Sequence, residues 1–416
     1  MKQRDRLIKR TGIKLLVFLA AVALLSPLLA NHRPLYMKYN GFSFFPAFST
    51  KHIVTTGNET VNYDFTDFKN LKTDFIIYAP IPWSPGKSDY LNSNVSPFDN
   101  QFFLTNLGNT IEMPVYFRHW LGTNNLGADV LSGLIHGFRY SFYIAIVALF
   151  VASFFGITLG LFAGYFGNTK LQKSRASTFS FLLIFSYLLF LFLNRGVFEL
   201  QQSRSPGNFH IGILLFIILC TSLLFYQIIK FFLISANSNY FKKEITIPLD
   251  NVISRSIEIT MAMPRLILII TLAAIVRPSL MNLGIIIGFS LWTELARFTR
   301  AQAIQLREMD FVTSARAMGF QNARILFKHI LINSMGPVIV VMCFAFSNVI
   351  LTESGLSFLG VGIPRQVVTW GSMLSAAREN TDAWWLTLFP GCCILLTVLL
   401  FNKLADSYSK NRALTF

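Results

Sequence analysis

Long apolar segments separated by charged connectors constrain this chain more than any other feature of its sequence. Of its 416 residues, 53% are hydrophobic and 13% are charged, and that charged fraction is about half of what a soluble protein carries. Inside a bilayer every backbone polar group must be satisfied within the protein, so only helices and closed barrels span it. Continuous rather than alternating apolar runs indicate helices. The sequence therefore predicts an all-α integral membrane protein, built as a polytopic helical bundle.

Eight apolar segments are candidate membrane spans. In chain order they are Leu15–Ala30, Tyr140–Phe166, Phe179–Leu193, Ile211–Ile229, Ile257–Val276, Met281–Leu295, Val338–Leu351 and Ala383–Leu404. Pro264 lies inside the fifth segment and is expected to kink it, because proline removes a helical hydrogen bond. We expect six of the eight segments to form the core of the bundle.

Basic residues are distributed unevenly, and their distribution predicts the topology. The formal net charge is +16. Lysine and arginine dominate residues 1–14, 170–175, 297–333 and 403–412, whereas acids and bases balance between residues 31 and 139. This is the positive-inside pattern of helical membrane proteins. We therefore expect both termini to be cytoplasmic and the excess charge to contact anionic membrane lipid, with no role in binding nucleic acid.

Two insertions interrupt the core spans. A basic leader and the first span occupy residues 1–30, and residues 31–128 are then the least hydrophobic part of the chain, rich in turn residues. We predict a small extracytoplasmic insert there, with a strand at Asp74–Tyr78. Residues 177–235 hold two extra apolar segments between basic flanks, which predicts an inserted helical hairpin whose tip, near Ser203, lies outside.

The segment Asp129–Arg139 has an amphipathic pattern. Its apolar residues form one stripe at helical spacing: Val130, Leu131, Leu134, Ile135 and Phe138. An aspartate at its start is typical of a helix N-terminus. Two interpretations are open, namely a helix that lies flat at the outer membrane surface and a plain extension of the following span.

The stretch Phe311–Pro337 is polar and basic, although apolar segments flank it on both sides. A charge at the bilayer centre costs at least about 2.5–3.5 kcal/mol, so this connector is expected to lie in water. Helix-forming residues surround Gly319, which predicts a short helix, a glycine turn and a second helix that enters the membrane. Small side chains at Ser314, Ala315 and Ala317 are expected to let another protein approach closely. The alternative is an ordinary solvated loop.

This stretch resembles the cytoplasmic coupling loop of ABC-importer permeases. The signature of that family is a Glu-Ala-Ala triplet, three residues, a glycine and, further on, an Ile-x-Leu-Pro-like ending. Here Thr313–Ala315 occupy the triplet, Gly319 matches the glycine and His329–Ile332 fill the ending. Threonine replaces the glutamate, serine the first alanine, and Ile332 the proline. The whole cytoplasmic coupling loop is expected to span residues 297–333.

Further stretches resemble the dipeptide and oligopeptide branch of that family. They are HWLGTNNLGADVLSGLIHGFRYS from His119, GLFAGYFGN from Gly160, ILTESGLSFLGVGIP from Ile350 and TWGSML from Thr369. Together they cover most of the chain from His119 to its C-terminus in the family's order, which makes the set far more specific than any single motif. The length of the extracytoplasmic insert resembles that of the microcin and larger-peptide subgroup.

The resemblance implies a permease subunit, with its transmembrane domain at residues 129–416, that forms half of a translocation pathway in a bacterial inner membrane. The residues that it implies for coupling to a cytoplasmic ATPase are Thr313, Ser314, Ala315, Arg316, Ala317, Met318, Gly319 and Arg324. A loop or re-entrant turn at Glu353–Pro364 is expected near the outer gate. The residues implied for that gate are Glu353, Ser354, Phe358 and Gly360.

The same resemblance implies the partners. These are a second permease subunit, expected to be a paralogue, two cytoplasmic ATPase subunits and an extracytoplasmic substrate-binding protein. ATP and Mg²⁺ are expected on the ATPase, with no cofactor bound by this chain. Relatives handle dipeptides, oligopeptides, modified peptides or nickel, so the substrate stays open.

No catalytic set of residues is visible in the sequence. The six histidines are scattered, without a His-Glu-x-x-His motif or a nucleophile elbow. The four cysteines fall within apolar spans and lack zinc-ligand spacing. The chain is therefore not expected to be an enzyme or to hold a metal. Two other classes remain, an ATP-independent secondary carrier, which should show inverted repeats, and a non-transport membrane scaffold.

Overall fold

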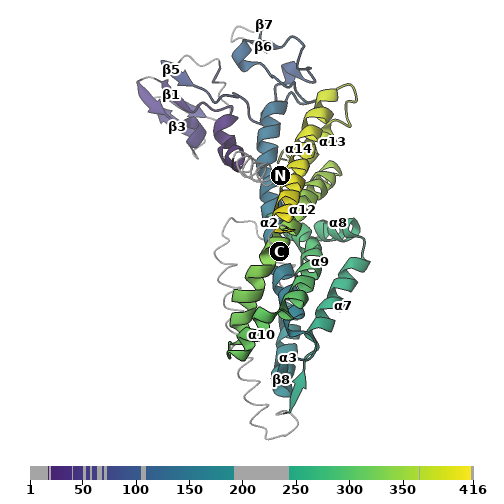
Figure 1. Cartoon of the computed structure of the whole chain (residues 1–416). Coiled ribbons are helices and arrows are strands. Elements are labelled where there is room, and N and C mark those ends of the chain that lie inside the picture. The colour runs from purple at the N-terminus through teal and green to yellow at the C-terminus, as the bar shows by residue number, and fades with distance from the viewer. Residues whose placement is uncertain are drawn as a thin grey trace. The chain divides into compact units, whose positions relative to one another are not determined.

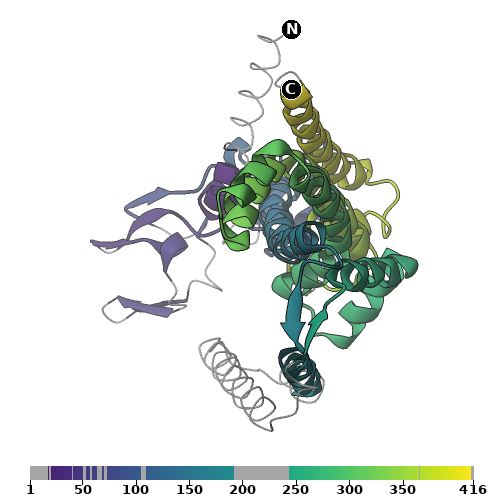
Figure 2. The same ribbon diagram turned by 60° about the horizontal axis from the view of Figure 1, so that its bottom comes forward.

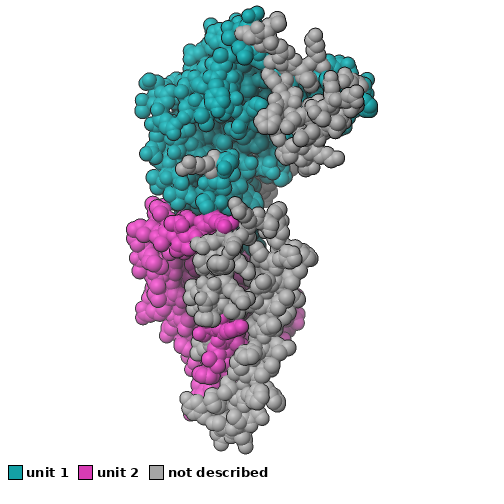
Figure 3. All heavy atoms as spheres, turned by 180° about the vertical axis from the view of Figure 1, so that it is seen from behind, with its two compact units in different colours: residues 1–150, 278–288, 339–416 teal, residues 151–277, 289–338 magenta. Residues whose placement is uncertain are grey.

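The computed structural model describes most of the chain. The described residues are 17, 20–39, 41–49, 53–56, 59–62, 68–69, 73–104, 109–191, 243–364 and 366–413. They belong to two compact units, which Figure 3 colours separately. Unit 1 comprises residues 1–150, 278–288 and 339–416, and unit 2 comprises residues 151–277 and 289–338.

Three helices in the described part of the chain are long and apolar enough to cross a membrane. They are α2 (Val130–Phe166), the continuous helix Asn322–Phe358, and the segment Trp384–Ser409 of α14 (Trp384–Ala413). A shorter apolar helix lies at Ala20–Leu29. Helix α9 (Leu280–Arg307) continues well beyond Leu295, where its predicted span ends. The helical membrane-protein class is confirmed, whereas the eight-span count stays a prediction because residues 192–242 lie outside the described part.

The expected kink at Pro264 is a sharp break between two helices. Helix α7 (Leu249–Ala262) and helix α8 (Arg265–Ile275) meet at 86°. Met263 between them has extended backbone angles, as the residue before a proline prefers. The prediction of a proline kink is confirmed, but its size means that the two helices together make a broken span or a re-entrant loop rather than one bent rod.

The second half of α2 packs closely against α9 within unit 2. Gly156, Gly160 and Gly164 recur at intervals of four residues on the face of α2 that meets α9. A β-carbon added at Gly160 would lie 2.4 Å from the carbonyl oxygen of Ala296, and one at Gly164 would lie 2.6 Å from the β-carbon of Ala303. Small residues spaced in this way let the backbones of two membrane helices approach each other.

A short two-stranded ribbon closes the base of the predicted inserted hairpin. Strand β8 (Gln172–Ser174) pairs antiparallel with β9 (Glu244–Thr246), beside the start of α3 (Arg175–Leu191; Figure 2). The ribbon ends with a hydrogen bond from the backbone N–H of Arg175 to the carbonyl of Lys243. The residues that flank the insertion, Ser174 and Glu244, therefore lie next to each other. The hairpin itself, with Ser203 at its predicted tip, lies largely outside the described residues.

Because the ribbon holds both ends together, the insertion is expected to be removable. Replacing residues 175–243 by Asn-Gly leaves Ser174 and Glu244 as the pair that flanks a two-residue turn. Asn-Gly is a favoured sequence for the two-residue loop of a β-hairpin. We expect the shortened chain to insert in the membrane and to melt within a few degrees of the wild type, measured by fluorescence-detected size exclusion after heating. Aggregation of the shortened chain, while a variant that replaces only residues 203–207 behaves normally, would contradict this expectation.

The insert in unit 1 is built of short strands and single turns. Strands β2 (Phe42–Phe44), β1 (Tyr36–Tyr39) and β5 (Phe75–Ile77) form one antiparallel sheet, in that order (Figure 1). Two separate ribbons are β3–β4 (Ile53–Thr56 and Glu59–Asn62) and β6–β7 (Phe102–Leu104 and Thr110–Glu112), and single helical turns are η1 (Pro46–Phe48), η2 (Tyr90–Asn92) and η3 (Val115–Phe117). The strand predicted at Asp74–Tyr78 is confirmed. The described part of the insert therefore consists of short strands and single helical turns, in contrast to the all-α class predicted for the chain as a whole.

The helical part of unit 1 joins the start of α2 to the C-terminal helices. The indole N–H of Trp370, on α13 (Trp370–Ala376), donates to the carbonyl of Leu134 over 3.0 Å. The rings of Phe346 and Phe401 stack at 3.9 Å and connect α12 (Ile332–Phe358) with α14. Of the two interpretations of the amphipathic segment, extension of the span is correct, because α2 is continuous from Val130.

Candidate functional site

The predicted coupling stretch forms a helix, a glycine turn and a second helix in unit 2. Helix α10 (Asp310–Ala317) ends where the N–H of Phe320 donates to the carbonyl of Ala315 and the N–H of Gly319 to that of Arg316. This pair of bonds is a Schellman motif, which requires a left-handed residue, and Gly319 has φ = +77°. The chain then re-enters a helix through α11 (Asn322–Arg324) and the π-helical turn η5 (Ile325–Leu331), which runs into α12.

One face of α10 is buried against its own chain. Val312 and Ala315 are 0% and 1% exposed. The hydrophobic cluster around them also contains Leu161, Tyr165, Ala303, Ile325, Leu326 and Ile330. The sequence predicts that Ser314, Ala315 and Ala317 share an exposed face. That prediction is wrong for Ala315, which is buried. Ala315 packs between α2, α9 and η5 and is not available to a partner.

The opposite face of α10 is open. Thr313, Ser314, Ala317 and Gly319 are exposed, and the side chain of Met318 is 65% exposed. Arg324 is also exposed and holds its guanidinium 4.4 Å from the centre of the Phe320 ring. Arg316 differs from these residues, because it is half-buried and its guanidinium lies 5.7 Å from the ring centre of Tyr165. The residues predicted for ATPase coupling thus divide into an outward-facing group and an inward-facing pair, Ala315 and Arg316.

Gly319 is expected to tolerate a side chain sterically but not conformationally. A β-carbon added there has no described atom within 4 Å, so the obstacle is the left-handed backbone. Gly319→Ala should cost about 1–2 kcal/mol of stability, and Gly319→Asn less, because asparagine visits this region more readily. Thermal melting of both variants in detergent is the measurement. Equal melting temperatures for the two variants would contradict the assignment of the cost to the backbone.

The residues predicted for the outer gate lie mostly in a helix, which corrects the expected loop at Glu353–Pro364. Glu353, Ser354 and Phe358 belong to the last turns of α12, and the turn begins only after them, with Gly360 at φ = +74°. Gly355 does not break the helix as expected, because the continuous apolar face of α12 packs within unit 1 and outweighs the intrinsic cost of one glycine.

Glu353 lies at the centre of a buried polar group in unit 1. Its side chain is 0% exposed and accepts a hydrogen bond of 2.8 Å from the hydroxyl of Ser141 on α2. Its second carboxyl oxygen has no hydrogen-bond partner among the described residues. Nearby, the hydroxyls of Ser357 and Thr369 lie 2.8 Å apart, and Thr369 caps the start of α13. The group therefore ties α2, α12 and α13 together.

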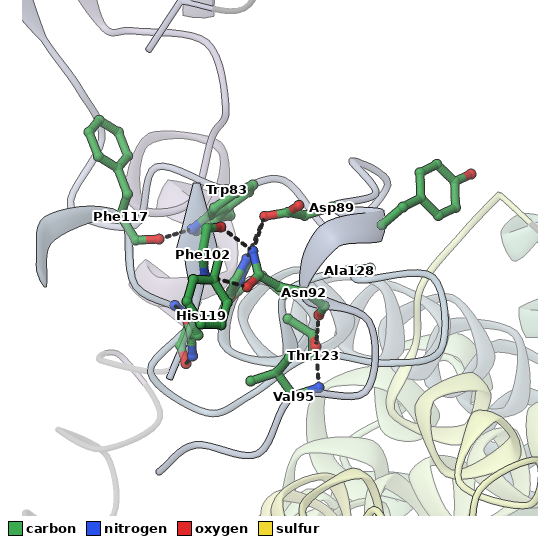
Figure 4. Close-up of polar contacts among 12 residues, drawn as sticks. Trp83, Asp89, Asn92, Val95, Phe102, Phe117, His119, Thr123 and Ala128 are labelled. Atoms are coloured by element: carbon green, nitrogen blue, oxygen red, sulfur yellow. Dashed lines mark hydrogen bonds and ion pairs between the residues drawn. The ribbon is translucent and has the colours of Figure 1, made fainter. Parts of the chain in front are cut away.

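A second buried polar network holds the N-terminus of α2 to the insert (Figure 4). Nδ1 of His119 lies 2.9 Å from Oδ1 of Asp129, whose other oxygen accepts the N–H of Ser132 and so caps α2. Nε2 of His119 lies 3.5 Å from Oδ2 of Asp89, and the imidazole stacks on Trp83 at 4.0 Å. His119 thus bridges two carboxylates from opposite sides.

Asn92 and Thr123 complete this network beside His119. The Asn92 amide donates to Asp89 and to the carbonyl of Phe102, both over 2.8 Å. The Thr123 hydroxyl donates to the carbonyl of Asn92 and accepts the N–H of Val95 (Figure 4). Sequence reasoning places His119 and Asp129 in one motif but misses these contacts, because the partners come from single turns, a three-residue strand and loops that are too short to show periodicity.

The charge of His119 makes this network sensitive to pH. Burial alone lowers the pKa of His119, but the hydrogen bonds to Asp129 and Asp89 and their negative charges outweigh it and raise the pKa above its ordinary value. The stabilisation is therefore fully present below the unfolded pKa of about 6.5 and is lost as pH rises through the raised folded value. We expect the melting temperature to fall on the alkaline side. His119→Gln should make the melting temperature less dependent on pH in this range. A variant whose melting temperature falls with pH as steeply as that of the wild type would contradict the role of His119.

Metal-ligating side chains do not gather into a cluster within the described residues. Within that part of the chain, no three His, Cys, Asp or Glu side chains come together as metal ligands. Cys343, Cys392 and Cys393 are free thiols.

Comparison with known proteins identifies the family. Residues 244–411 match the family described as "Binding-protein-dependent transport system inner membrane component". The dipeptide transport system permease protein DppC of Alkalihalophilus pseudofirmus is 30% identical over 303 residues, which cover 73% of this chain and 73% of that relative. A Brucella suis protein named "Putative peptide transport system permease protein" is 38% identical over 158 residues, or 38% of this chain and 53% of that relative.

These matches confirm the resemblance drawn from the sequence motifs. The match to DppC extends over most of both chains, whereas the match to the Brucella protein covers about half of that relative. The family domain at 244–411 contains α10, Gly319 and the residues around Glu353. This chain therefore belongs to the family of inner-membrane permease components of binding-protein-dependent transport systems.

Proposed function

We propose that this chain is the permease subunit of an ATP-driven peptide importer in a bacterial inner membrane. The observation that carries the proposal is the open face of α10, which ends in a Schellman turn inside the family domain. Relatives named as dipeptide and peptide transport permeases support peptides as the substrate class. The chain forms half of the pathway, and a second permease, expected to be a paralogue, forms the other half.

A cytoplasmic ATPase docks on the outward-facing residues of the coupling stretch Phe311–Pro337. These residues are Thr313, Ser314, Ala317, Met318, Gly319 and Arg324. ATP and Mg²⁺ are bound by two such ATPase subunits and not by this chain. Movement of α10 reaches the membrane through Val312 and Ala315, which pack on Leu161 and Tyr165 of α2. Helix α10 thus contacts both the ATPase and the membrane helices. ATP binding to the ATPase thereby shifts the equilibrium between two conformations of the permease.

At the outer side, an extracytoplasmic binding protein delivers the peptide. Glu353 and Ser354 are buried in unit 1, so their proposed role at the gate is to hold α2, α12 and α13 in register rather than to touch the peptide. Both termini are proposed to be cytoplasmic, in accord with the basic residues near each end of the sequence.

Co-purification tests this function. The chain is extracted in mild detergent from the cell that makes it, and the proteins that accompany it are identified and assayed for ATP hydrolysis. We expect an ATPase and a second permease in the complex. A chain that purifies without an ATPase under conditions that preserve the fold would overturn the proposal and favour a secondary carrier or a membrane scaffold.

A further inference from the structure

Three cationic side chains converge around Tyr165 in unit 2. The ring centre of this buried tyrosine lies 5.9 Å from the Lys170 ammonium and 5.7 Å from the Arg316 guanidinium. Arg307 joins them by donating to the carbonyl of Gly164 over 2.9 Å. The cations come from the end of α9, from α10 and from the residues after α2, so the fold brings them together.

The charges of this cluster are not balanced within the described residues. Glu308 pairs with Arg307 over 2.8 Å. Neither Lys170 nor Arg316 has a salt-bridge partner in the described part of the chain, and one terminal nitrogen of Arg316 is buried without a hydrogen bond there. Partial burial lowers the pKa of Lys170, and the charges of Arg316 and Arg307 lower it further, against Glu308 alone. Such a site attracts an anion.

The cluster lies where two long apolar helices end. Tyr165 is the penultimate residue of the apolar helix Val130–Phe166, and its hydroxyl donates over 2.7 Å to Asn322, the first residue of the apolar helix Asn322–Phe358. A tyrosine with basic residues at the end of a span is typical of the headgroup region of a bilayer. Arg316 faces this tyrosine and not the open side of α10, where Ala317 and Met318 lie.

We propose that Lys170, Arg307 and Arg316 form a binding site for a phosphate group, which an anionic phospholipid headgroup supplies. The phosphate oxygens accept from the free nitrogen of Arg316 and from Lys170, while Arg307 remains held by Glu308 and Gly164. The bound lipid neutralises the cluster and fixes α10 to the membrane surface. The proposed lipid site rests on this group of three cations, and it is independent of the substrate that the chain transports.

The test measures lipid binding to the purified full chain in neutral detergent. Phosphatidylglycerol or phosphatidylcholine is titrated in mixed micelles, and the rise in melting temperature gives an apparent affinity. We expect stabilisation by phosphatidylglycerol and little by phosphatidylcholine. Lys170→Gln with Arg316→Gln should weaken the phosphatidylglycerol affinity by about fivefold per charge removed.

Matched variants make the result specific. Lys328→Gln with Lys403→Gln removes two exposed cations elsewhere and should leave the affinity unchanged, and Lys170→Arg with Arg316→Lys should retain it. Equal affinities for the two lipids, or equal losses in the two Gln pairs, would overturn the proposal. Full stabilisation by inorganic phosphate alone would overturn the lipid assignment. An unchanged lipid response together with loss of a co-purifying ATPase would assign the cluster to that partner instead.

Discussion

Ala317→Glu is expected to reduce transport roughly thirtyfold in a chain that still folds, whereas Ala315→Glu is expected to unfold it. Ala317 lies on the open face of α10, where a charged side chain blocks close approach of a partner. Loss of one central contact in an interface costs about 2 kcal/mol or more. Ala315 is 1% exposed, and an unpaired buried carboxylate costs about 3–5 kcal/mol.

The two outcomes are separated by measuring uptake and melting temperature on the same preparations. Ala323→Glu is the matched control, because Ala323 is exposed on the neighbouring helix α11 and is not one of the residues proposed to dock the ATPase. It should retain both uptake and stability. If Ala317→Glu melts as early as Ala315→Glu, or if Ala323→Glu loses uptake equally, then α10 has no special role in coupling.

Gly160→Ala is expected to be strongly destabilising, although alanine is the better helix former. Its β-carbon would lie 2.4 Å from a backbone oxygen of α9, so the two helices must separate. Overpacking of this kind costs typically about 1–3 kcal/mol, and more where backbone must move. Melting of the purified chain in detergent measures the effect.

Gly391 provides the matched control for this prediction. It lies within α14, and a β-carbon added there has no described atom within 4 Å. Gly391→Ala should be neutral or stabilising by up to about 1 kcal/mol, because alanine is favoured in helix interiors. Equal melting temperatures of the Gly160 and Gly391 variants would contradict the close approach of α2 and α9.

Several parts of the fold follow from local sequence signals. The break at Pro264 and the turn at Gly319 rest on backbone chemistry that single residues impose, and both are found at the predicted positions, although the bend at Pro264 is sharper than a kink. The spacing of Gly156, Gly160 and Gly164 was visible in the sequence as well. It is a small-residue pattern at intervals of four, which indicates close helix packing but does not by itself identify α9 as the partner.

Other parts depend on tertiary contacts that a local pattern does not contain. Helical spacing shows that Val312 and Ala315 share a face, but not that their own chain covers that face. The glycines after Glu353 suggested a loop, whereas packing within unit 1 extends α12 through Phe358. His119 contacts Asp89, thirty residues earlier in the chain, and no local periodicity predicts such a contact.

The most direct test of the account is ATP-dependent peptide uptake in vesicles that contain the chain with its co-purified ATPase, second permease and binding protein. Wild-type vesicles are compared with and without ATP, and with vesicles that carry Ala317→Glu. We predict uptake that requires ATP and that falls roughly thirtyfold in the variant, while Ala323→Glu vesicles behave as the wild type. Uptake that persists without ATP, and that Ala317→Glu leaves unchanged, would contradict it.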